Sequence, residues 1–179
     1  MVEIVYYVAM SVDSYIATSD GRVEWLSRFH TSGEDYGAGA LHASVDALLL
    51  GSHTYEFALK LGKWPVPDKP SYVFTKRKLR VLHPSITLTP ESPRKLVDSL
   101  AARGLRRAWL MGGGKLAASF RAEQLISRYV ISVFPVLLGS GVPFLTPDRR
   151  SLDELRLVAA KPFPSGIVQL TYDRRETPG

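Results

Sequence analysis

With 179 residues, 45% of them hydrophobic and 22% charged, the chain suits a single globular domain spanning residues 1–179. It contains no cysteine, which excludes disulfides, thiolate metal sites and a cysteine nucleophile, and we expect a cytoplasmic protein. The net charge of +6 comes without a nucleic-acid-binding motif, and no apolar stretch approaches the ~20 residues of a membrane helix, so we expect neither nucleic acid nor a membrane as a partner.

Runs of β-branched and aromatic residues alternate with stretches of helical periodicity along the chain. The expected strands cover Ile4–Met10, Ala47–Leu50, Tyr72–Thr75, Ser85–Leu88, Ala108–Met111, Tyr129–Leu138, Leu155–Lys161 and Ile167–Tyr172. The expected helices cover Glu34–Ala43, Thr54–Leu61, a segment that begins at Ser92 and ends before Gly104, and Lys115–Arg121. This alternation predicts an α/β fold with a mainly parallel sheet, helices on both faces and an antiparallel C-terminal hairpin.

The glycine-rich segment WLMGGGKLAASF is the strongest local signal for chemistry. A hydrophobic strand stops at three glycines and a helix begins at once, so free N–H groups and the positive end of a helix dipole can bind phosphate there. The expected phosphate cradle consists of Gly112, Gly113, Gly114, Lys115 and Leu116. The segment is neither a Walker motif nor the GxGxxG fingerprint, and a tight turn without a ligand is the alternative.

Two further junctions follow strands and carry hydroxyl or basic side chains. The first contains Gly51, Ser52, His53 and Thr54, which can offer free N–H groups to a ligand or can simply cap a helix. The second contains Thr75, Lys76, Arg77 and Lys78, whose cations can hold a 2′-phosphate or can form a solvated turn. Because ligands of open α/β sheets bind beyond the carboxyl ends of strands, one anionic dinucleotide would account for all three junctions.

Six short motifs then identify a resemblance that covers nearly the whole chain. The segments YYVAMSVDSYIA, DGRVEWL, ALLLGSHTYE, YVFTKRK, MGGGKL and PVLLGSGVPFL occur in the order seen in the dihydrofolate reductase superfamily. They most resemble the branch that includes the riboflavin-biosynthesis reductase domain (the RibD C-terminal domain) and stand-alone reductases. The resemblance implies a dihydrofolate-reductase-like three-layer α/β/α sandwich with a mixed sheet of about eight strands, NADPH as hydride donor, and a homodimer.

The resemblance also implies roles for single residues around the cofactor. The nicotinamide would be bordered by Ala9, Ile16 and Ala17. The GSHT turn (residues 51–54) would hold phosphate, the cradle at 112–116 the pyrophosphate, and residues 75–77 the adenosine ribose and its 2′-phosphate. Relatives often carry arginine where Ser52 stands, so a preference for NADPH must rest on Lys76 and Arg77, with Lys78 as a further candidate.

On the substrate side, the resemblance points to Trp25, Glu34 and Asp35. Asp35 matches the carboxylate that assists protonation in dihydrofolate reductases, and Glu34 is adjacent to it. Both acidic residues can instead favour a helix N-terminus electrostatically, and Trp25 can be a lid over the nicotinamide or a core residue. The histidines outside the GSHT turn show no metal-ligand spacing, so we expect no metal.

The sequence therefore predicts an NADPH-dependent oxidoreductase that transfers a hydride to a C=N or C=O group of a small heterocyclic or sugar-like substrate. The pyrimidine reductase of riboflavin biosynthesis and dihydrofolate reductase are alternatives within the enzyme class. A nucleotide-binding module without catalysis is the alternative outside it.

Overall fold

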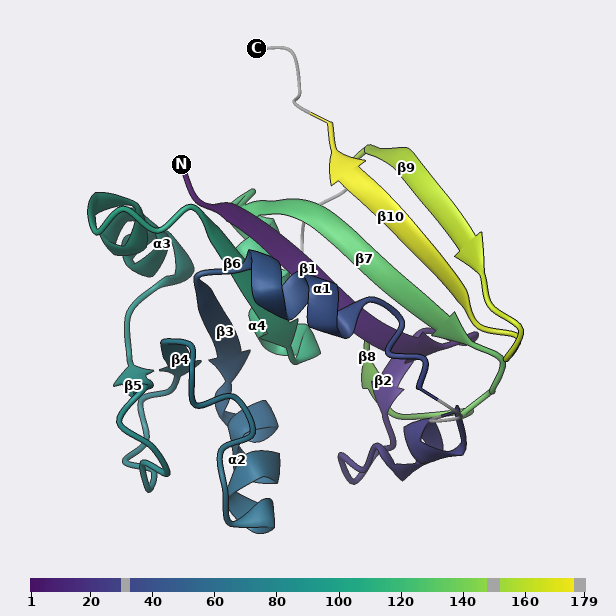
Figure 1. The fold of residues 1–179 in the computed structure, drawn as a ribbon, viewed down its shortest axis with the longest axis horizontal. Helices are drawn as coiled ribbons and strands as arrows, with labels where there is room; N and C mark the ends of the chain where they lie inside the picture. The colour runs from purple at the N-terminus through teal and green to yellow at the C-terminus, as the bar shows by residue number, and fades with distance from the viewer. Residues whose placement is uncertain (30–32, 148–151, 176–179) are drawn as a thin grey trace.

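The structure is a computed structural model that describes residues 1–29, 33–147 and 152–175. Eight strands form one sheet in the order β5-β4-β3-β6-β1-β7-β10-β9 (Figure 1). Their bounds in chain order are β1 (Glu3–Ser11), β3 (Ala47–Gly51), β4 (Ser71–Phe74), β5 (Ile86–Thr89), β6 (Arg107–Gly112), β7 (Ile126–Phe134), β9 (Leu155–Pro162) and β10 (Val168–Arg174). The strands from β5 to β7 in this order are parallel, whereas β10 runs antiparallel to both β7 and β9.

Helices cover both faces of the sheet, as Figure 1 shows for α1 and α4. They are α1 (Ala38–Ser44), α2 (Ser52–Leu61), α3 (Pro93–Ala102) and α4 (Gly114–Ala122). Alternate residues of β1 point to opposite faces: Ile4 and Tyr6 join the core under α3 and α4, while Val5 joins the core under α1. The predicted three-layer α/β/α sheet with its antiparallel C-terminal pair is therefore confirmed. Among the described helices, none is both long and apolar enough to cross a membrane.

Two predicted elements have different bounds in the structure. The helix expected over Glu34–Ala43 begins only at Ala38, because Tyr36 (φ 54°) and Gly37 (φ 88°) adopt left-handed backbone conformations that an α-helix cannot contain. The strand expected over Tyr129–Leu138 lies earlier, over Ile126–Phe134. It ends before Pro135, which has no N–H group for a ladder hydrogen bond.

A second, two-stranded sheet lies at the carboxyl end of β1 and was not predicted. Its strands are β2 (Tyr15–Ala17) and β8 (Val142–Pro143), which pair antiparallel. A short 3₁₀ helix, η1 (Glu24–Phe29), follows β2. These pieces belong to the long loop after β1 and to the LLGSGVPFL segment, and both of them help to form the site described next.

Candidate functional site

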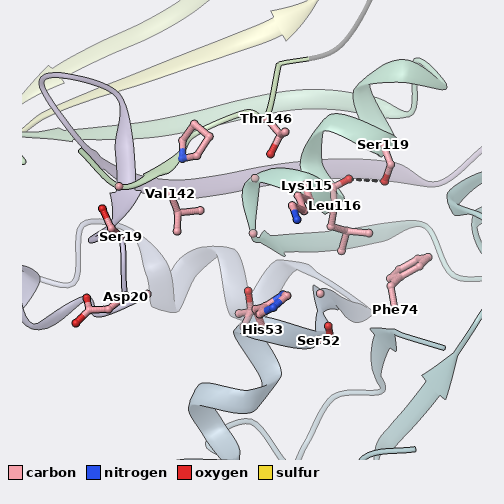
Figure 2. Close-up of a pocket in the computed structure, with 17 residues that line it drawn as sticks. Ser19, Asp20, Ser52, His53, Phe74, Lys115, Leu116, Ser119, Val142 and Thr146 are labelled. Carbon is pink, nitrogen blue, oxygen red and sulfur yellow. Dashed lines mark hydrogen bonds between the residues drawn. The ribbon is translucent and has the colours of Figure 1, made fainter. Parts of the chain in front are cut away.

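A cavity of about 780 Å³ lies where the parallel strands end. The β3–α2 and β6–α4 turns, the end of β4, the loop after β2 and the β8 segment form its walls. Figure 2 shows Ser52 and His53 of α2 facing Lys115 and Leu116 of α4 across it. This is the place at which ligands of open α/β sheets bind.

The GSHT and MGGGKL turns touch each other at this cavity. Leu50 pairs with Gly112 in the β3–β6 register, so the two turns leave the sheet at the same level. A Cβ atom built on Gly51 would lie 3.7 Å from both the Gly112 carbonyl oxygen and the Gly113 nitrogen. A Cβ atom built on Gly113 would lie 3.8 Å from Thr54 Oγ1. The two turns that the sequence assigns to one ligand are therefore side by side.

Both helices that open into the cavity lack a side-chain cap. Gly51 is the N-cap residue of α2 and Gly113 that of α4, and neither has a side chain that could accept from the first-turn N–H groups. By contrast, the Ser92 side chain caps α3 by accepting from the Lys95 N–H. The first-turn N–H groups of α2 and α4 must therefore be satisfied by water or by an anion, and their helix dipoles favour the anion. These uncapped termini fit the phosphates of a dinucleotide.

Most of the predicted cofactor residues line the cavity. They are Gly51, Ser52, His53, Thr54, Gly113, Gly114, Lys115 and Leu116. Gly112 precedes them in the turn at φ 102°, a conformation that favours glycine. Ile16 reaches the same turn, since its Cδ1 atom would lie 3.9 Å from a Cβ atom on Gly113. Ala17 is buried in β2, next to the wall that β8 forms.

Other predicted cofactor residues lie beside the cavity rather than in its lining. Residues 75–77 directly follow Phe74, which does line it. The Thr75 hydroxyl accepts from the Arg77 N–H at 3.0 Å, so it shapes the turn, and Lys76 is exposed in that turn. Ala9 lies elsewhere, in the aromatic cluster around Phe134.

The three predicted substrate residues do not line the cavity. Trp25 packs edge-on against Phe134, with ring centroids 5.5 Å apart, and its buried Nε1 has no hydrogen-bond partner among the described residues. The Glu34 carboxylate accepts from the Tyr36 N–H, so it serves the turn before α1.

Asp35 occupies the same turn, just before α1. Its carboxylate accepts from the N–H groups of Gly37 and Gly39 at 2.9 Å each. These two hydrogen bonds lower the pKa of Asp35, so the exposed carboxyl group is ionised at neutral pH. The geometry thus gives Asp35 the helix-start role that the sequence left open.

The cavity wall formed by the LLGSGVPFL segment is the main part of the site that sequence reasoning missed. Gly141, Val142 and Pro143 line the cavity from this segment, and Thr146 lines it directly after the segment ends. A Cβ atom on Gly114 would overlap the Pro143 carbonyl oxygen, and one on Gly141 would overlap the Ala17 carbonyl oxygen. The glycines at 114 and 141 therefore permit backbone-to-backbone contact, and the spacing of glycines in the motif is the signal that could have revealed the wall.

Asp13 anchors this wall to the end of β1. Its carboxylate accepts from the N–H groups of Leu138 (3.1 Å) and Gly139 (2.7 Å) and from the Ser11 hydroxyl (2.6 Å). The hydrogen bond from Ser11, followed by those from the two backbone N–H groups, lowers the pKa of Asp13. The buried Tyr6 hydroxyl holds the next part of the segment, because it donates to the Phe144 carbonyl oxygen at 2.8 Å.

The loop after β2 forms the remaining side of the cavity. Ser19, Asp20 and Gly21 line it, and the Asp20 carboxylate pairs with Arg22 at 2.6 Å. The hydroxyls of Ser19 and Ser140 lie 3.2 Å apart and join this loop to the β8 segment. The described residues contain no group of three His, Cys, Asp or Glu side chains placed to hold a metal ion.

Known relatives match the chain over almost its full length. The sequence model of the RibD C-terminal domain matches residues 2–169. The uncharacterized protein YwjB of Bacillus subtilis (strain 168) is 36% identical over 171 residues, which cover 95% of this chain and 97% of that protein.

Solved structures show the same fold. A Shewanella sp. PV-4 protein, provisionally named a riboflavin biosynthesis protein, has a TM-score of 0.88 and 29% identity, covering 98% of this chain and all of that one. A Thermotoga maritima diaminohydroxyphosphoribosylaminopyrimidine deaminase/ 5-amino-6-(5-phosphoribosylamino)uracil reductase has a TM-score of 0.72 and 14% identity, covering 97% of this chain and 57% of that one. The fold is thus the dihydrofolate-reductase-like one that the sequence predicts, and the chain belongs to the RibD C-terminal domain family.

Proposed function

We propose that the protein is a reductase that binds NADPH in the 780 Å³ cavity, with the pyrophosphate between the N-termini of α2 and α4. The observation that carries this proposal is the pair of uncapped helix N-termini in contact at one cavity. Membership of the RibD C-terminal domain family supports it, and so does the name of the Thermotoga maritima protein of the same fold, a deaminase/reductase of which this chain covers 57%.

Different residues around the cavity bind different parts of the cofactor. Backbone N–H groups of the GSHT and MGGGKL turns bind phosphate oxygens, and the Lys115 ammonium group offsets their charge. Leu116, Val142 and Pro143 supply apolar walls that exclude water from the bound cofactor. When bound, NADPH supplies the hydride, and the protein orients it.

The substrate in this proposal is a small heterocyclic or sugar-like molecule with a reducible C=N or C=O group. The pyrimidine reductase reaction of riboflavin biosynthesis is the first alternative, and it requires a further site for the ribose phosphate of its substrate. Dihydrofolate reduction is the second alternative, and it requires a carboxylate such as Asp35 at the reacting ring. Because both carboxylate oxygens of Asp35 accept hydrogen bonds from backbone N–H groups at the start of α1, we assign proton delivery to water.

Binding and turnover test the proposal separately. NADPH at 100 times its Kd should stabilise the native state by about 2.7 kcal/mol, which raises the melting temperature by roughly 5–10 °C. NADPH oxidation across a panel of heterocyclic and sugar-like carbonyl and imine compounds then distinguishes a reductase from a silent nucleotide-binding module. A melting temperature that neither NADPH nor NADH changes at millimolar concentration contradicts the proposal.

A further inference from the structure

We infer that Glu56 is a positioning residue, which holds Arg77 beside the first turns of α2 and thereby confers preference for the phosphorylated ribose of NADPH over the plain ribose of NADH. The inference rests on the proposed function, because it concerns how the same cavity distinguishes two dinucleotides. The role falls to an acidic side chain, that of Glu56, although the group to be recognised is a phosphate.

The ion pair joins two separate walls of the site. Arg77 Nη1 lies 2.8 Å from Glu56 Oε1. Glu56 follows Ser52 by one helical turn, so both lie on the same face of α2, and Ser52 lines the cavity. Arg77 lies three residues after Phe74, another lining residue. The pair therefore fastens the loop after β4 to the helix whose N-terminus opens into the cavity.

The backbone of Arg77 is fixed as well as its side chain. Its N–H group donates to Thr75 Oγ1 at 3.0 Å, which closes a tight turn directly after β4. A free arginine side chain loses much rotational freedom when it binds a ligand. Because Thr75 and Glu56 have already ordered Arg77, a phosphate meets a guanidinium that loses less freedom on binding.

The ion pair leaves donors available for a phosphate. A guanidinium carries five N–H donors, and the contact with Glu56 uses Nη1. The Arg77 side chain is 53% exposed, whereas that of Glu56 is 31% exposed. The hydrogen bond from Arg77 lowers the pKa of Glu56, so the carboxylate stays ionised and retains the guanidinium at neutral pH. The remaining N–H groups can donate to two phosphate oxygens at once, which the planar guanidinium of arginine does better than the ammonium group of lysine.

The cavity lining itself contains few positively charged side chains. Among the described lining residues, Lys115 is the one lysine or arginine, and it lies on α4 with the pyrophosphate cradle. Position 52, at the start of α2, carries an uncharged serine. Arg77 follows the lining residue Phe74 by three positions, so the Glu56–Arg77 pair adds a positive charge beside the cavity that a phosphate on the ribose could use.

A double-mutant cycle measured with both dinucleotides tests this inference. The variants are Glu56→Ala, Arg77→Met and the double variant, and the readout is the Kd of NADPH and of NADH by calorimetry. Arg77→Met should weaken NADPH binding about tenfold or more, since it removes hydrogen bonds to a charged group. Glu56→Ala should weaken it by a smaller factor and add nothing in the Arg77→Met background, because Glu56 acts through Arg77. NADH affinity should stay within about twofold in all three, since NADH lacks the phosphate that the pair recognises.

Two further variants control the test. Glu56→Gln keeps an oxygen that accepts from Arg77 and should recover part of the NADPH affinity. Glu154→Ala removes one surface carboxylate, paired with Arg175 at 3.2 Å on the β9–β10 hairpin, and should leave both affinities unchanged. Circular dichroism and melting temperatures without cofactor verify that each variant folds.

Three outcomes would overturn the inference: tighter or unchanged NADPH binding by Glu56→Ala, additive effects in the double variant, or equal losses for NADPH and NADH. If the wild-type protein binds NADPH and NADH but the variants show one of these outcomes, the role of Glu56 is refuted and the proposed function is not. Wild-type protein that binds neither dinucleotide refutes both.

Discussion

Gly113 and Gly114 are adjacent in the chain, but a side chain added at each position would have different contacts. A Cβ atom on Gly113 would meet Thr54 Oγ1 at 3.8 Å, an ordinary contact, whereas one on Gly114 would overlap the Pro143 carbonyl oxygen. We therefore expect Gly113→Ala to fold normally but to bind NADPH more weakly, since it adds a methyl group to the cavity lining. Gly114→Ala should lose about 1–3 kcal/mol of stability, because the β8 wall must move. Thermal unfolding with and without NADPH checks both expectations, and a Gly114→Ala variant as stable as the wild type would disprove the tight contact.

A single substitution distinguishes the two roles of Asp35, which are to accept hydrogen bonds at the start of α1 and to transfer a proton. Asparagine keeps one oxygen that accepts a backbone N–H at the start of α1 but cannot transfer a proton. If Asp35 serves the backbone, Asp35→Asn should keep the turnover of the wild type and lower the melting temperature slightly. Steady-state kinetics with NADPH check this. A large fall in kcat together with an unchanged melting temperature would restore the catalytic assignment.

At the scale of elements, the sequence predicted the strands of the main sheet because they are rich in apolar, β-branched and aromatic residues; Ala47–Leu50 is a purely apolar example. It predicted the cavity-facing turns because glycines and hydroxyl residues stand where strands end. The segments β2 and β8 are too short to carry a periodic pattern, so their pairing, and with it the cavity wall, appeared only in the structure. The late start of α1 depends on the left-handed backbone of Tyr36, which its sequence does not signal.

The attachment of the β8 segment to β1 through Asp13 predicts a specific pH dependence. The pKa of Asp13 is lower in the folded chain than its ordinary value of 3.8, chiefly through the hydrogen bond from Ser11. Its stabilising contribution is therefore complete well above pH 3.8 and is lost as the pH falls through the folded pKa. Melting temperatures of wild type and Asp13→Asn should differ most at about pH 6 and converge towards about pH 3. Asp98→Asn, on an exposed position of α3, is the control, and a difference that stays constant with pH would contradict the assignment.

At the scale of the whole molecule, the C-terminal hairpin leaves the sheet with an apolar edge. β9 is the last strand in the sheet order, and its side chains Leu157 (54% exposed) and Val158 (44% exposed) lie where the β9–β10 register shifts. Exposed edge strands of this kind pair readily with another chain. The expected homodimer, which remains a prediction, would use this edge. Light scattering should give twice the chain mass for the wild type and the single-chain mass for Leu157→Glu, and a monomeric wild type would contradict the prediction.

One dinucleotide bound by two helix N-termini is the central claim for the whole molecule. A crystal structure of the protein with NADP⁺ tests it most directly. We expect the pyrophosphate oxygens to accept hydrogen bonds from backbone N–H groups of both α2 and α4, with Leu116 and Val142 lining the bound cofactor. Phosphates that contact one helix alone, or a cofactor bound away from this cavity, would contradict it.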